Sequence, residues 1–285
     1  MPLLALGLLL IAAVLHATWN LFVKLATEKQ VMTWLALIVG AVCYLPIVIL
    51  SPRVPLSSWP FVLSSACFEA FYFTLLLRAY QYGDFSLVYP IARGTAPAML
   101  AVWAALFLGE HPRLFGVLGI SLLVLGLMIV GGSAWWAMRK KAKVSTNALG
   151  LALGTAFCIS IYTAIDGAAV RHVDPLPYTV IVLALAAVLI TPAILIRYGK
   201  GAILGELRVN WWRILLVGIL TLLTYILVLE AYTLMRVSYA GAIRECSVVV
   251  GAFLGWRLLG ESFGVIRLLG SMLIFIGILV IAVAG

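Results

Sequence analysis

Apolar runs, each long enough to cross a lipid bilayer as a helix, follow one another along almost the whole chain. Of the 285 residues, 65% are hydrophobic and only 10% are charged. Soluble domains are roughly 45–50% apolar and about 25% charged, so this chain has too little polar surface to fold in water. A spanning helix needs roughly 20 apolar residues. We therefore expect an all-α integral membrane protein.

Ten transmembrane helices account for these runs. Pro112 and Pro175 each suit the first turn of a helix, where a missing backbone N–H is tolerated, and Ser262 can cap another helix. The expected helices cover residues 2–24, 31–50, 60–81, 85–108, 113–134, 147–170, 176–198, 211–235, 238–258 and 264–284.

Two long stretches, residues 79–130 and 231–281, resemble each other in their glycines and charges. We expect one unit used twice, with residues 1–136 as the first repeat, 137–146 as a basic connecting loop and 147–285 as the second repeat. Because five is an odd number of helices, the second copy must enter from the opposite side. This predicts an inverted 5+5 repeat around a central polar cavity, as in many secondary transporters. The shared positions are Ala79/Ala231, Tyr80/Tyr232, Ser86/Ser238, Arg93/Arg244, Ala101/Ala252, Leu108-Gly109-Glu110/Leu259-Gly260-Glu261, Gly119/Gly270 and Gly126/Gly277.

Charged residues inside the apolar runs are the candidates for function. A charge at the bilayer centre costs at least about 2.5–3.5 kcal/mol, so each one needs a reason. Our hypothesis is that Arg93, with Arg244, holds an anionic group. Glu69, with Glu245, would hold a cationic group or a proton. The predicted substrate-binding residues are Arg93, Glu69, Tyr89, Tyr72, Arg244, Glu245, Tyr225, Asn20, His16 and Trp19, with Glu69 and Asp166 as candidate coupling residues.

Structural roles compete with these assignments. His16 could be a hydrogen-bonded core histidine, and Lys24 could extend to the membrane interface. Arg244 and Glu245 are neighbours, about 100° apart on a helix, so we expect them not to face each other, and each could pair with another helix. Asp166 could lie near the membrane surface, because its helix is expected to end soon after it.

Prolines and glycines predict where the bundle is open and where it is packed. Pro90 and Pro97 each remove a hydrogen bond inside one helix, either as a packing kink or to open its backbone toward the cavity. Residues 238–258 have no matching prolines, so the cavity wall should be asymmetric. Repeated glycines let the fifth and tenth helices approach closely. Glu110 and Glu261 precede these two helices and are expected to accept hydrogen bonds from their first N–H groups.

No sequence feature indicates an enzyme. The four cysteines fall inside apolar runs without metal-ligand spacing, and the sequence carries no nucleotide-binding, hydrolase or metalloprotease motif. We expect no catalytic residues, no metal and no cofactor.

The basic residues indicate an orientation. They gather on the side of the expected bundle that holds the 137–146 loop, and cytoplasmic loops carry such an excess. We therefore expect this loop in the cytoplasm and both termini outside, and we do not read the net charge of +9 as a sign of nucleic-acid binding. The residues on this side are Lys29, Arg78, Arg139, Lys140, Lys141, Lys143, Arg197, Lys200, Arg208, Arg213, Arg257 and Arg267, against Arg53, Arg113, Arg171 and Arg236 on the other.

The twin Leu-Gly-Glu turns at residues 108–110 and 259–261, each followed by a glycine-rich helix, resemble the EamA type of the drug/metabolite transporter superfamily. Residues 89–97 and 16–20 are similar to a bacterial subgroup of it, which implies the inner membrane. The resemblance implies that helices four, five, nine and ten pack together. It also implies export or exchange of small metabolites, such as amino acids, driven by a gradient.

The resemblance leaves the coupling residue open. Small four-helix relatives depend on a carboxylate in their first helix, where this chain has His16 and Asn20. Glu69 or Asp166 would have to substitute. Eukaryotic relatives are usually drawn with their termini in the cytosol, against the orientation that the basic residues indicate.

We expect a secondary transporter, an exporter or exchanger, that moves a small charged or zwitterionic metabolite by alternating access. Its partners would be a small-molecule substrate and the lipid bilayer, and it would be a monomer or a weak homodimer. The alternative is a flippase for a lipid-linked or amphipathic anionic substrate, or a membrane assembly partner without solute flux. An enclosed cavity sized for a metabolite favours the transporter, and a cavity split toward lipid favours the flippase.

Overall fold

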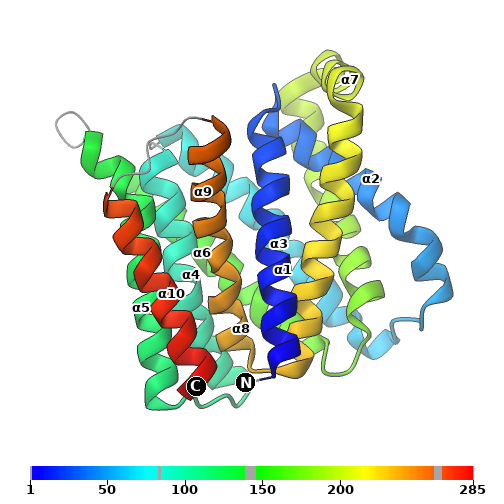
Figure 1. The fold of residues 1–285 in the computed structure, drawn as a ribbon. Helices are drawn as coiled ribbons and strands as arrows, with labels where there is room; N and C mark the ends of the chain where they lie inside the picture. Colours follow the sequence, from blue (N-terminus) through cyan, green and yellow to red (C-terminus); the bar gives the residue numbers. More distant parts are fainter. Residues whose placement is uncertain (1, 83–84, 139–145, 260–264, 285) are drawn as a thin grey trace.

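The computed structural model describes residues 2–82, 85–138, 146–259 and 265–284, and within these ranges every regular element is helical. The helices run roughly side by side, and the two termini lie at the same end of the bundle (Figure 1). The elements are α1 (Leu3–Lys24), α2 (Lys29–Leu50), the 3₁₀ helix η1 (Leu56–Ser58), α3 (Trp59–Tyr82), α4 (Phe85–Phe107), α5 (Leu114–Met138), α6 (Thr146–Ala169), α7 (Pro175–Leu234), α8 (Val237–Ile243), the 3₁₀ helix η2 (Arg244–Cys246), α9 (Ser247–Leu259) and α10 (Val265–Ala284).

Large apolar side chains cover the outward faces of the bundle. Ile49 and Phe107 are each 72% exposed, and Val283 is 85% exposed. An apolar surface of this extent fits lipid, where helices satisfy their own backbone hydrogen bonds. Among the described residues, five helical stretches are long and apolar enough to span a membrane, and three shorter ones are also apolar. The five are Leu3–Lys24, Lys29–Leu50, Leu56–Leu76, Thr146–Ala169 and Pro175–Leu234, and the three are Ile91–Phe107, Leu114–Val130 and Leu268–Val283.

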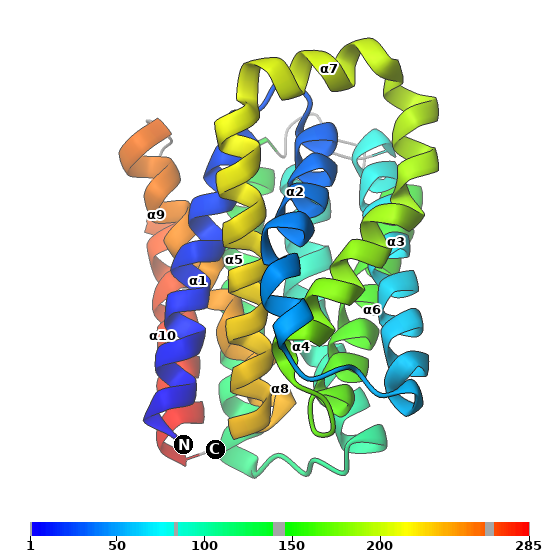
Figure 2. The same cartoon turned by 90° about the vertical axis from the view of Figure 1, so that its right-hand side faces the viewer.

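Two of the expected helices, 176–198 and 211–235, are both present in α7, whose backbone leaves helical angles close to the two expected boundaries. The chain stays helical as it arches across one end of the bundle (Figure 2), with non-helical angles at Gly199 (φ 66°) and Asn210 (φ −115°). Glu206 in this crossing is buried and accepts hydrogen bonds from the backbone N of Glu28 (3.0 Å) and from Nδ2 of Asn210 (2.7 Å).

α4 is continuous from Phe85 to Phe107, so Pro90 and Pro97 do not end the helix. The expected helix 238–258 is instead divided by η2, a 3₁₀ turn with tighter hydrogen bonding. The two helices that align in the sequence repeat therefore differ, as expected, but the helix that is divided is the one without prolines.

α5 and α10 lie antiparallel and in close contact (Figure 1). A Cβ on Gly119 would lie 2.8 Å from the carbonyl O of Gly277, and a Cβ on Gly126 would lie 2.6 Å from the carbonyl O of Gly270. Side chains at these positions would force the backbones apart, so only glycine permits this approach. The predicted glycine packing of these two helices is confirmed.

Glu110 caps a different helix from the one expected. Its Oε1 accepts a hydrogen bond from the backbone N of Val237 (2.7 Å), and its Oε2 accepts from the backbone N (3.1 Å) and the hydroxyl (2.7 Å) of Ser238. These groups belong to the first turn of α8, so the prediction that Glu110 caps α5 is wrong. The folded chain brings the start of α8 to the turn after α4, and that N-terminus offers the carboxylate its donors. Glu261 lies outside the described residues.

Candidate functional site

A cavity of about 100 Å³ lies between the helices, and many residues that border it stand near the middle of their helices. Its wall comes from α1, α2, α3, α4, α6, α7, η2 and the start of α9. It combines charged groups with aromatic rings, which is the usual composition of a small-molecule site. The bordering residues are Ala12, Ala13, His16, Trp19, Thr33, Leu37, Glu69, Tyr72, Phe73, Arg93, Tyr162, Leu183, Thr221, Thr224, Tyr225, Val228, Arg244, Glu245 and Ser247.

Most of the predicted site residues border this cavity. Asn20 is exposed instead, and its Nδ2 donates to the backbone carbonyl O of His16 (2.8 Å). Asp166 is buried behind the cavity wall. The Tyr89 side chain lies outside the described residues. The predicted residues at the cavity are His16, Trp19, Glu69, Tyr72, Arg93, Tyr225, Arg244 and Glu245.

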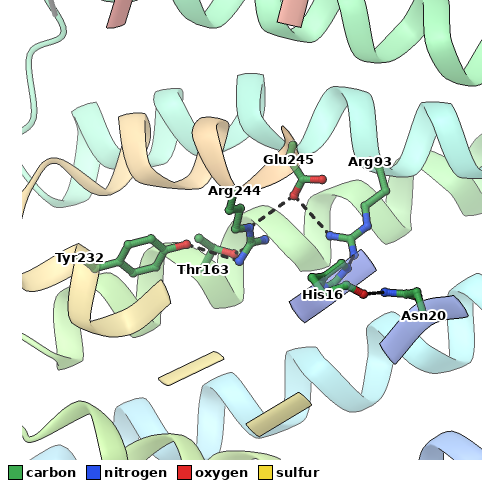
Figure 3. A network of polar contacts seen from close by, with 7 residues as sticks. All are labelled: His16, Asn20, Arg93, Thr163, Tyr232, Arg244 and Glu245. Carbon is green, nitrogen blue, oxygen red and sulfur yellow. Dashed lines mark hydrogen bonds and ion pairs between the residues drawn. The ribbon is translucent and has the colours of Figure 1, made fainter. Parts of the chain in front are cut away.

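Glu245 joins the two arginines (Figure 3). Its Oε1 lies 3.3 Å from Nη1 of Arg93 and 3.3 Å from Nε of Arg244. Only 2% of the Glu245 side chain is exposed, and its Oε2 has no hydrogen-bond partner among the described residues. The prediction that Arg244 and Glu245 do not face each other is therefore wrong. Both residues belong to η2, and their long side chains bend to the same point between η2 and α4.

His16 fixes the other side of Arg93. Nη2 of Arg93 lies 3.0 Å from Nε2 of His16 (Figure 3). Because a guanidinium can only donate, Nε2 of His16 must be the acceptor and the ring is neutral in this arrangement. The histidine ring also meets the edge of Trp19, with 4.8 Å between ring centroids. His16 is therefore both hydrogen-bonded and at the cavity, which unites the two roles considered for it.

Arg244 is held by two residues that the sequence did not single out as site residues. Its Nη1 donates to the hydroxyl of Tyr232 and its Nη2 to Oγ1 of Thr163, both at 3.3 Å. Thr163 stands three residues before Asp166 on the polar face of α6, and Tyr232 aligns with Tyr80 in the sequence repeat. These two signals could have found them.

Glu69 stands apart from the arginine cluster. It borders the cavity, is only 5% exposed, and forms no ion pair or hydrogen bond within the described part of the chain. The cavity therefore contains two guanidiniums, one carboxylate shared by them, and a second carboxylate that holds no cation. With both carboxyls ionised its charges would sum to zero, arranged as a positive part and a negative part.

Aromatic side chains complete the wall. The ring of Tyr72 lies 4.8 Å from that of Phe73 and 6.3 Å from that of Tyr162, centroid to centroid. Nε1 of Trp19 is buried and has no hydrogen-bond partner among the described residues. An unsatisfied donor in a cavity wall marks a position where a ligand acceptor or a water would be stabilised.

A further carboxyl lies behind Tyr225. Asp166 is 0% exposed, although it lies only three residues before the end of α6 at Ala169. Its Oδ1 accepts a hydrogen bond from the hydroxyl of Tyr178 (2.7 Å), and its Oδ2 accepts one from the hydroxyl of Tyr225. The two tyrosines come from the two arms of α7, which close over the end of α6 and cover this carboxyl.

The apolar helices and the charged internal cavity define a multi-pass membrane protein of the transporter class. The chain belongs to the EamA-like transporter family, in the drug/metabolite transporter superfamily, because the family profile matches residues 3–132 and again residues 146–283. A comparison with curated proteins found no match. One solved structure, described only as "Crystal structure of protein", is similar over 99% of both chains with a TM-score of 0.77 and 17% sequence identity. At this identity the likeness concerns the fold alone.

Proposed function

We propose that this protein is a secondary transporter that moves a small charged or zwitterionic metabolite, such as an amino acid or a related compound, by alternating access. The observation that carries the proposal is the pair of guanidiniums that share one carboxylate oxygen at the wall of an internal cavity. A guanidinium has five N–H donors, and the described contacts of Arg244 use three of them. The remaining donors, with Nε1 of Trp19, would hold the anionic group of a substrate.

Glu69 gives the substrate a second recognition element. An ionised carboxylate without a cation at a largely buried position is costly, and a substrate ammonium or other cationic group would offset that cost. Opposite charges on one small molecule would then match the separated charges of the cavity. Glu245, which the sequence predicts to act with Glu69, is the counter-ion that the two arginines share in this proposal.

Cavity size favours a small solute over the flippase alternative. Pockets for drug-sized ligands measure roughly 300–1,000 Å³, whereas this cavity measures about 100 Å³. A compact metabolite fits such a volume after modest rearrangement, but a lipid-linked headgroup would need a much wider opening.

The glycine contacts support an inverted 5+5 repeat. In the sequence alignment Gly119 corresponds to Gly270 and Gly126 to Gly277, while in space Gly119 meets Gly277 and Gly126 meets Gly270. Such crossed pairing is what a two-fold axis between two copies requires. We propose ten spans, two of them supplied by α7 and one by α8, η2 and α9 together. Alternating access would come from rocking of the two copies around the cavity.

The proposed location is the bacterial inner membrane, with residues 137–146 in the cytoplasm and both termini outside. The α7 crossing with its basic residues Lys200, Arg208 and Arg213 lies at the end of the bundle opposite the termini (Figure 1). Cytoplasmic sides carry this excess of lysine and arginine.

A ligand screen followed by flux measurement tests the proposal. Purified protein in detergent is heated with amino acids, phosphonates, amines or sugar phosphates. A compound at 100 times its Kd should stabilise the folded protein by about 2.7 kcal/mol.

Uptake of the radiolabelled compound found in this screen into proteoliposomes should be abolished by Arg93→Ala. Arg78→Ala, which changes an exposed arginine outside the cavity, is the matched control and should retain uptake. Full uptake by a monodisperse Arg93→Ala variant would remove Arg93 from the site.

A further inference from the structure

Asp166 is a buried carboxyl for which the proposed substrate contacts have no use. It lies on α6, outside the cavity, and Tyr225 stands between them because its ring borders the cavity while its hydroxyl donates to Asp166. The second donor, Tyr178, comes from the other arm of α7. One carboxyl therefore links α6 to both arms of α7.

The charges of the interior do not balance when Asp166 is ionised. Arg93 and Arg244 supply two positive charges, while Glu69, Glu245 and Asp166 would supply three negative ones. Glu245 contacts both arginines, and Glu69 faces the same cavity as they do. Asp166 contacts no cation among the described residues. An isolated buried carboxylate is strongly disfavoured. Asp166 is the more deeply buried of the two carboxyls without a cation, so a proton bound there would remove the excess negative charge.

Ser65 lets the site accommodate either protonation state. It lies on α3 beside Asp166 and is fully buried. A protonated carboxyl carries an O–H that needs an acceptor, whereas an ionised one only accepts. A hydroxyl can serve as acceptor in the first state and donor in the second. The Ser65 hydroxyl is thus placed where a proton on Asp166 would need an acceptor.

Few other polar groups around Asp166 could accept a hydrogen bond from its proton or donate one to its carboxylate. The titratable and charged groups that act on Asp166 come from α3, α7 and η2. Toward α6, α4 presents the indole of Trp103, which donates to Ser160, and α8 presents Val237 at Gly167. The groups that act on Asp166 are Glu69, Tyr178, Tyr225, Tyr232 and Arg244.

We propose that Asp166 is a proton-binding site and that Tyr225 couples it to the substrate cavity. Loss of the proton makes both tyrosine hydrogen bonds charge-assisted and therefore stronger, which draws the two arms of α7 onto α6. Binding of the proton relaxes Tyr225, which is part of the cavity wall. The coupling half of this inference rests on the proposed function, whereas proton binding itself does not.

Infrared difference spectroscopy tests proton binding without any substrate. Purified protein in detergent is compared between mildly acidic and alkaline solution, and the carbonyl stretch of a buried protonated carboxyl is followed. We expect this band in the wild type and its loss in Asp166→Asn. Glu69→Gln, which removes the nearest competing carboxyl, should retain it. Survival of the band in Asp166→Asn, or its loss in Glu69→Gln, would overturn the assignment.

Two tyrosine variants keep the test decisive if Asp166→Asn does not fold. Tyr178→Phe and Tyr225→Phe retain the carboxyl but each remove one hydrogen bond to it, so the band should shift to higher frequency in both. An unchanged frequency in both variants contradicts the assignment of the band to Asp166.

Coupling to the cavity needs a separate measurement. A compound found in the ligand screen should alter the band in the wild type and not in Tyr225→Phe. A band that no transported ligand alters overturns the coupling and leaves the transporter proposal standing.

Discussion

The pair α5–α10 and the helices around the cavity are held together by different kinds of contact. Between α5 and α10 the contact is backbone against backbone, through glycines such as Gly126 and Gly270. Around the cavity it is made by long polar side chains that meet at Glu245. Direct backbone contact is lost after small displacements because dispersion attraction has a short range. Hydrogen bonds between long side chains can be remade with new partners, so the cavity side is the part able to rearrange.

The largest expected effect comes from removing the shared counter-ion on the cavity side. Glu245→Gln keeps the shape of the side chain but leaves the guanidiniums of Arg93 and Arg244 without their carboxylate. Breaking a buried ion pair by removing one partner costs about 3–5 kcal/mol. We expect a loss of this size in the unfolding free energy, measured by titration with a denaturing detergent in mixed micelles.

A partly exposed ion pair provides the matched control. Arg171 lies 3.6 Å from Glu110, and 44% of its side chain is exposed. Exposed pairs contribute about 0–1 kcal/mol, so Arg171→Ala should change the unfolding free energy little. If Glu245→Gln were no more destabilising than Arg171→Ala, the charge cluster would not be what holds the cavity helices together.

The glycine side should respond to the addition of a single methyl group. In Gly126→Ala the new Cβ would lie 2.6 Å from the carbonyl O of Gly270 and 2.8 Å from the backbone N of Ile274. Overpacking of this kind costs about 1–3 kcal/mol, and backbone atoms cannot rotate away as a side chain can. We expect a loss of that size in the same detergent titration.

Gly150 on α6 is the control for this substitution, because a Cβ there would meet nothing within 4 Å. Alanine is favoured over glycine inside a helix by up to about 1 kcal/mol, so Gly150→Ala should be neutral or stabilising. Equal effects of Gly126→Ala and Gly150→Ala would mean that the α5–α10 contact is not the rigid part of the molecule.

Some features of this molecule could be predicted from its sequence and others could not. The α5–α10 contact was predictable because glycines that recur at matching positions in two repeats strongly favour close packing of the helices that carry them. Arg93, Glu69 and Arg244 were predictable as cavity residues because lipid excludes charges. In each case one strong physical constraint acts on the residue itself and does not depend on which neighbours the fold supplies.

The missed features depend on neighbours that only the fold brings together. Glu110 finds its donors on α8, more than a hundred residues away in sequence. The contact between Arg244 and Glu245 requires the η2 turn, which no proline marks. The burial of Asp166 depends on both arms of α7 closing over the end of α6, which the position of Asp166 along the sequence does not reveal.

The smallest effect on the unfolding free energy is expected from the removal of one hydrogen bond to Arg244 on the cavity side. It tests whether the polar contacts there can replace one another. Tyr232→Phe removes the hydroxyl that accepts from Nη1 of Arg244 but keeps the ring. A hydrogen bond to a charged group contributes about 1.5–3 kcal/mol, but Arg244 retains Thr163 and Glu245, so the single change should cost less than this. Combining Tyr232→Phe with Thr163→Val should cost more than the sum of the two single changes, because each hydroxyl can replace the other and neighbouring sites couple. Strict additivity in the detergent titration would show that the polar contacts do not substitute for one another, and the contrast with the glycine pair would then fail.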